Sequence, residues 1–171
     1  MSQIVIAVAV LLVPVVILYW SFSRIPEPQA KAVDWRPVVE NAQTQAPFEV
    51  AVPQHLPDTW TVVRARWTPV GQPGLDQKPA AGNTFQLGFV TPDRVYIGLD
   101  QRDADPIGLI ASVTRDGAED GESTIGATVW KRYVSRDGRT RAIVRSDDQS
   151  TLVISGDLPY EALETFASTL G

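Results

Sequence analysis

Apolar residues follow two arrangements along the chain: one unbroken run near the N-terminus, and short alternating patterns from residue 47 onward. The run from Ile4 to Trp20 holds seventeen residues without a charged side chain, and extending it to Phe22 approaches the ~20 residues that cross a bilayer as a helix. Aromatic side chains, which favour the lipid-water boundary, lie at its C-terminal end, and Arg24 is the first charge. This pattern predicts a transmembrane helix in residues 1–23 that contacts the membrane through residues 4–22.

A cleaved signal peptide and a buried core helix are the alternatives for this run. A signal peptide has a basic start, and Met1-Ser2-Gln3 carries no basic side chain. Arg24, Lys31 and Arg36 follow the run and no cation precedes it, a bias that by itself favours a cytoplasmic C-terminal domain.

Residues 24–46 are rich in proline, glutamine and alanine, which is typical of a linker or stalk, with a short helix expected from Trp35 to Gln43. The folded domain is expected at residues 47–171. Within it, period-two alternation or turn chemistry predicts strands at 48–52, 61–67, 129–134, 139–144 and 151–154, and a hairpin from Thr84 to Asp100.

Two helices are expected in the same domain. Asp105-Pro106 has the residue types of a helix start, and the apolar face is supplied by Ile107, Ile110, Ala111 and Val113. An acidic loop follows this helix. Pro159 opens the second helix, in which Leu163, Phe166, Ala167 and Leu170 form one stripe. The fold class is therefore α+β, with a largely antiparallel sheet and a C-terminal helix packed on it.

Composition narrows the function classes. The chain has 171 residues, a formal net charge of −5, no cysteine and one histidine, which excludes disulfides, thiolate metal sites and a cysteine nucleophile. From Asp34 onward 13 basic residues stand against 19 acidic ones, so nucleic acid is not an expected partner.

Candidate catalytic and metal-binding residues are few. His55 lies in a proline-bounded turn without a Gly-x-Ser-x-Gly elbow, so a surface role is favoured over a catalytic one. Asp100, Asp103 and Asp105, with a second acidic group near Asp116, offer oxygen ligands, but their spacing does not fit an EF-hand. We expect no catalytic residue, metal or cofactor.

Basic residues concentrate between Lys131 and Arg145, with six cations and one acid. Because side chains alternate along a strand, Arg139, Arg141 and Arg145 should share a face. This face is a candidate surface for an acidic partner or for anionic lipid headgroups, and a solvated sheet face is the alternative.

Several short segments in a fixed order resemble the actinobacterial family of domain of unknown function 4245. They are PFEVAVPQHLPDTW at 47–60, RARW at 64–67, GFVTP at 88–92, YIGLDQ at 96–101, Ile125-Gly126 with Trp130, and LVISG at 152–156. The resemblance implies a single-pass protein with an extracytoplasmic domain and supplies no activity. The C-terminal part also looks like accessory domains of other bacterial envelope proteins, which implies a curved sheet.

The expected function is that of an uncharacterised, membrane-anchored cell-envelope protein, a non-enzymatic binding or scaffolding module with a protein partner in the envelope. The alternative is a carrier or sensor of a small apolar or envelope-derived ligand, held between the aromatic sheet face and the loop Thr68–Asn83. A third hypothesis, an enzyme, requires His55 to converge with Asp100 and Asp103.

Overall fold

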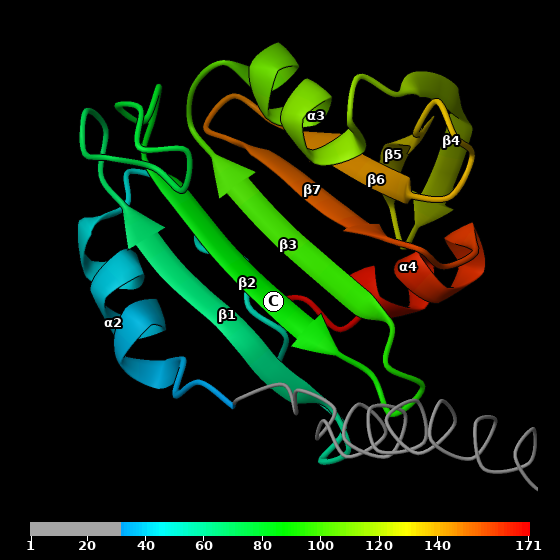
Figure 1. Ribbon diagram of the computed structural model, residues 1–171, viewed down its shortest axis with the longest axis horizontal. Helices are drawn as coiled ribbons and strands as arrows, with labels where there is room; N and C mark the ends of the chain where they lie inside the picture. Colours follow the sequence, from blue (N-terminus) through cyan, green and yellow to red (C-terminus); the bar gives the residue numbers. More distant parts are fainter. Residues whose placement is uncertain (1–31) are drawn as a thin grey trace, which may run out of the picture. The chain divides into compact units, whose positions relative to one another are not determined.

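The structure is a computed structural model that describes residues 32–171. In this part of the chain seven antiparallel strands form one curved sheet in the order β1-β2-β3-β7-β6-β5-β4 (Figure 1). The strands are β1 (Thr61–Thr68), β2 (Thr84–Val90), β3 (Tyr96–Arg102), β4 (Ala118–Ile125), β5 (Thr128–Val134), β6 (Arg141–Ser146) and β7 (Thr151–Gly156). The helices are α2 (Arg36–Gln45), α3 (Pro106–Thr114) and α4 (Tyr160–Ala167). The predicted α+β class, antiparallel sheet and packed C-terminal helix are confirmed.

The predicted transmembrane helix lies outside the described residues. Between residues 32 and 171 no helix is both long enough and apolar enough to cross a bilayer.

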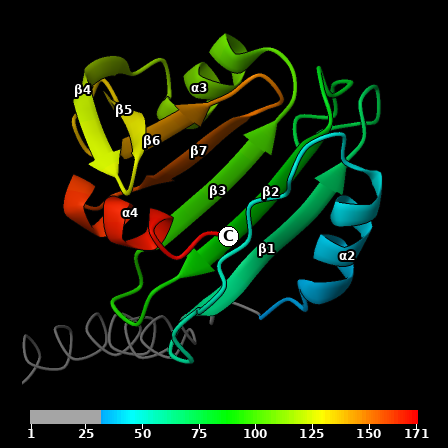
Figure 2. The ribbon, with the colours of Figure 1, turned by 180° about the vertical axis from the view of Figure 1, so that it is seen from behind.

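The main core lies on one face of the sheet. Alternate residues of β2 and β3 point into it, and Phe85, Leu87, Phe89 and Leu99 are each 0% exposed. The helix α4 and residues 46–56 cross this face, as Figure 2 shows from behind. Burial of such side chains supplies most of the driving force for folding.

The segment 48–52 is not a strand of the sheet, which corrects the sequence-based prediction. Phe48, Val50 and Ala51 are buried against the core face. The buried side chain of Gln101 accepts from Ala51 N–H at 2.9 Å and donates to the Glu49 carbonyl at 2.9 Å. One side-chain amide therefore gives this segment hydrogen bonds that a neighbouring strand would otherwise supply.

The helix α2 belongs to the compact unit and packs beside β1. Its Val39 and Ala42 are buried in the main core, so the folded unit includes residues that the sequence places in a stalk.

The opposite face of the sheet is only partly covered. The helix α3 lies over β6 and β7, where Leu109 packs on Ala142, Val144 and Val153. Ile107, predicted to face the core, is 81% exposed, which corrects that residue, whereas the predicted Ile110 and Val113 pack against this cluster. The same face remains open over β1, β2 and β3.

The strand β4 occupies the segment predicted as an acidic loop. It forms one edge of the sheet, pairs with β5, and carries a bulge between Glu119 and Glu122 at Gly121, whose φ is +92°. Most of its side chains are exposed, so the strand has no apolar alternation from which to predict it.

Candidate functional site

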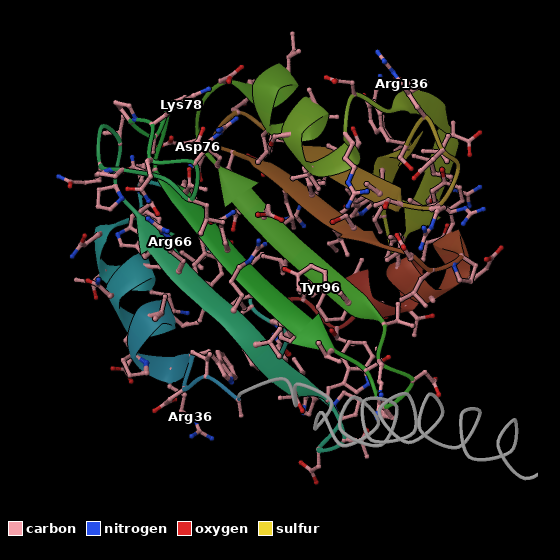
Figure 3. All side chains as sticks on the ribbon, in the orientation of Figure 1. Arg36, Arg66, Asp76, Lys78, Tyr96 and Arg136 are labelled. Carbon is pink, nitrogen blue, oxygen red and sulfur yellow. The ribbon has the colours of Figure 1, made fainter. Side chains whose placement is uncertain are left out.

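A polar groove lies on the open face of the sheet. It encloses about 690 Å³ between β1–β3, the helix α3 and the loop that carries Asp76 and Lys78 (Figure 3). Its floor is made by side chains that point away from the main core, among them Arg64, Gln86 and Asp100. The volume is within the ~300–1,000 Å³ range of small-molecule sites.

A bulge in β1 directs Arg64 into the groove. Val62 pairs with Phe89 and Arg64 pairs with Gly88, so Val63 is an extra residue in β1. Val62 therefore turns into the core, whereas simple alternation places it on the same face as Arg64. Bulges commonly re-aim a side chain in this way.

Arg64 is held by a buried carboxylate. Its Nη2 donates to both oxygens of Asp100, at 3.1 and 3.3 Å, and Gln86 Nε2 donates to the same carboxylate at 2.6 Å. Burial raises the pKa of Asp100, and the Arg64 guanidinium and the Gln86 amide oppose that rise. Since both oxygens accept hydrogen bonds, Asp100 acts chiefly to orient Arg64 and Gln86.

Tyr96 lies flat on two glycines at the base of the groove. Gly88 and Gly98 pair with each other across β2 and β3, and Tyr96 covers both. A Cβ atom built on Gly88 would lie 2.5 Å from the Tyr96 hydroxyl oxygen, and one on Gly98 would lie 3.3 Å from the ring. The ring is thus set directly on backbone, with 41% of the residue exposed and the Arg64 guanidinium carbon 5.7 Å from its centroid. Burial raises the pKa of the Tyr96 hydroxyl.

The loop over the groove is tied to the sheet. Arg66 donates to the Pro73 carbonyl at 2.6 Å, and Asn83 Oδ1 accepts from Val70 N–H at 3.1 Å. The Asp103 carboxylate accepts from the backbone and side chain of Asn83, at 2.8 and 2.6 Å. These bonds fix one wall of the groove.

Arg64 and Arg102 each have a buried donor without a partner among the described residues. Arg102 donates to the Asp105 carbonyl at 2.7 Å through Nη2. The Nε atoms of Arg64 and Arg102 are buried and have no partner among the described residues. Buried donors without partners carry a free-energy cost.

The three aspartates singled out from the sequence do not converge. Asp100 pairs with Arg64, Asp103 binds Asn83, and Asp105 caps α3 by accepting from Gly108 N–H at 3.0 Å. Across residues 32–171, no group of three or more histidine or acidic side chains is placed to hold a metal ion. His55 lines a hollow on the core face, on the other side of the sheet from Asp100.

The three arginines proposed as a partner surface lie on β6 or just before it. Arg141 and Arg145 flank the buried Ile143 on β6, and Arg139 precedes that strand. The guanidinium carbon of Arg141 lies 5.8 Å from the Tyr160 ring, and that of Arg145 lies 5.4 Å from the Trp130 ring. Arg139 is 3.7 Å from Asp157.

The pocket expected between the aromatic face and the loop 68–83 does not form. Phe85 and Phe89 are fully buried in the core, whereas the loop lines the groove on the opposite face. An apolar hollow does exist, but on the core face between α4 and the turns at 55–60 and 91–95.

Sequence reasoning missed Tyr96 and its two glycines as site residues. The available signal was the isolated glycine in each of the two strand patterns, because such a glycine often marks a close approach of another group. That signal does not identify the approaching group, which depends on the register of β2 against β3.

No curated protein matches the chain. The model of the family described as protein of unknown function (DUF4245) matches residues 1–170, and the chain therefore belongs to that family.

Proposed function

We propose that the chain is a single-pass protein of the cell membrane whose C-terminal domain lies outside the cytoplasm and serves as a non-enzymatic binding module of the envelope. The support for the anchor is the apolar run of residues 4–22 in the sequence. The support for the binding role is the polar groove on the open sheet face.

The ligand that fits the groove best is a polyhydroxylated ring, such as a saccharide unit of the envelope. The single observation that carries this proposal is Tyr96 lying on Gly88 and Gly98, with the Arg64 guanidinium over its ring and Gln86 lining the same groove. An aromatic face provides apolar contact for the C–H face of a sugar, and the neighbouring planar polar groups bond its hydroxyls. The Arg64 side chain, 29% exposed in the groove, can donate to a ring oxygen or an acidic substituent.

Binding is favoured over catalysis because the groove's buried carboxylate is already engaged. Asp100 is 4% exposed and accepts from both Arg64 and Gln86, which leaves it poorly placed to exchange a proton with a ligand. His55, the histidine that the enzyme hypothesis needs, lies on the other face of the sheet.

The test is direct binding of cell-wall saccharides. We would screen the full chain in detergent against an array of bacterial cell-wall glycans and measure affinity for the best binder by titration calorimetry. Tyr96→Ala and Arg64→Lys should each weaken binding by about tenfold or more, which corresponds to ~1.4 kcal/mol.

Arg136→Lys is the matched control, because Arg136 is exposed and Figure 3 shows it on the turn before β6, apart from the groove. An array without any binder would refute the proposed ligand class. Equal affinity in wild type and Tyr96→Ala would remove the groove from the binding site.

A further inference from the structure

A second hollow lies on the core face, at the end of the sheet where β2 turns into β3. It encloses about 460 Å³, and its walls come from the turn 55–60, the turn 91–95 and the helix α4. Apolar side chains form most of the lining, including Trp60, Val95 and Leu158. Its volume suits a small ligand or part of a larger one.

The floor of this hollow is preformed and rigid. The Trp60 ring stacks on Phe166 with centroids 5.7 Å apart and planes 10° apart, and both rings contact Phe89. Phe166 is 5% exposed and Ile97 is 1% exposed, so the hollow is an opening onto the packed core. Apolar surface of this kind at the protein surface commonly marks a binding site.

The rim is polar and uncharged or acidic. His55, Thr165 and Asp93 line the opening, and neither lysine nor arginine is among the lining residues within the described chain. An apolar floor with a polar rim fits an amphiphile whose tail is inside and whose headgroup is at the mouth. Because no described lysine or arginine lines the mouth, the hollow does not select a lipid by a negative charge on its headgroup.

The hollow lies where the domain joins its N-terminal segment. The Val33 N–H donates to the Val62 carbonyl at 2.8 Å, and Val62 is two residues from Trp60, a wall of the hollow. Ten residues separate Phe22, at the end of the apolar run, from Val33. A fully extended chain spans at most ~3.6 Å per residue, so the eleven steps from Phe22 to Val33 cover roughly 40 Å at most.

We propose that the hollow binds an acyl chain of a membrane lipid. The proposal rests on the membrane anchor of the proposed function only for the source of that lipid; the hollow's chemistry stands independently of it. The tether keeps the mouth of the hollow within reach of lipid, and the apolar floor accepts a hydrocarbon chain without requiring a polar partner.

The test is photo-crosslinking of the full chain in nanodiscs of phosphatidylcholine, a fraction of which carries a diazirine on its acyl chain. Adducts outside residues 4–22 should concentrate on peptides that contain residues 55–60, 91–97 and 158–169. Ala162→Trp fills the hollow from α4 and should lower these adducts about tenfold or more. Thr165→Trp, at an exposed lining position that tolerates a large side chain, should do the same.

Glu161→Trp is the matched control, because it adds the same ring to an exposed position of α4 that does not line the hollow. It should keep the wild-type adducts. Circular dichroism checks that every variant is folded.

Adducts confined to residues 4–22, or unchanged in both Ala162→Trp and Thr165→Trp, would overturn the proposal. A dimer in nanodiscs that both substitutions abolish would assign the hollow to a second copy and overturn it equally. Carbonate extraction tests the membrane anchor separately, because a chain that carbonate releases from membranes would refute the anchor. Crosslinking with the same photolipid in detergent micelles would still test whether the hollow binds an acyl chain.

Discussion

Replacing Gly88 by alanine tests the contact on which the groove depends. The Cβ atom of alanine would lie 2.5 Å from the Tyr96 hydroxyl oxygen and 2.8 and 2.9 Å from two ring carbons. Non-bonded carbon atoms in contact lie ~3.5–4.0 Å apart, so the ring must move away by about 1 Å.

The expected cost follows from how the ring can respond. Overpacking costs ~1–3 kcal/mol in a closed site. Tyr96 is 41% exposed and can swing outward, so we expect the lower part of that range, ~1–2 kcal/mol. Gly98→Ala is a graded comparison: its nearest contacts would be 3.2 Å to Ser155 Oγ and 3.3 Å to the ring, and its cost should be below ~1 kcal/mol.

Urea unfolding in two backgrounds measures this coupling. In Tyr96→Ala the ring is absent, so Gly88→Ala loses its three nearest contacts, and alanine in a strand is favoured over glycine by ~0.5–1 kcal/mol. The substitution should therefore destabilise the wild type and stabilise the Tyr96→Ala variant, with a coupling free energy of ~1.5–3 kcal/mol. The same free-energy change in both backgrounds would refute the stacking of Tyr96 on Gly88.

Three further predictions concern the core, the α4 network and the orientation. Phe89→Ala, at a residue that is 0% exposed, should lower the free energy of unfolding by ~3–5 kcal/mol. Val129→Ala, at a residue that is 56% exposed, should change it by less than ~0.5 kcal/mol. Similar urea midpoints for the two variants would contradict the core assignment. Hydrogen bonds from Ser123 and Arg132 lower the pKa of Glu164 in the folded chain. The ionised carboxylate therefore stabilises the fold at pH values above the pKa of Glu164 in the unfolded chain, and this stabilisation is lost as the pH falls through the lower pKa of the folded chain. Glu164→Gln should thus cost ~1–2 kcal/mol at pH 7 and almost nothing near pH 3, and a gap that is constant with pH would count against the ion pair. Protease treatment of whole cells should cleave the domain after Arg24, while full protection until lysis would establish the cytoplasmic orientation that the flanking charges favour.

The sequence predicts those elements whose burial has a period and whose ends have turn chemistry. The hairpin over 84–100 is an example, because Phe85, Leu87 and Phe89 alternate on one face and Thr91-Pro92-Asp93 closes the turn. Alternation of apolar and polar residues shows that one side of a segment is buried, but it does not show which segment pairs with it by hydrogen bonds. This is why the segment 48–52 has the pattern of a strand yet packs across the sheet.

The remaining differences have equally local causes. The helix α3 is apolar on several sides, so the sequence does not distinguish Ile107 from Leu109 as the buried residue. The groove joins side chains from β1, β2 and β3, and only the register of these strands brings Tyr96 over Gly88. The bulge at Val63 is invisible in the sequence because valine fits either face.

The edge strand β4 determines how the sheet meets another copy of itself. An unpaired strand edge is a template for intermolecular pairing and aggregation. Here such pairing would bring Glu119, Asp120 and Glu122 against a second acidic edge, and the bulge at Gly121 breaks the regular row of donors and acceptors. At the other edge α2 packs beside β1. Each outer strand of the sheet thus has a feature that opposes strand pairing with a second copy of the domain.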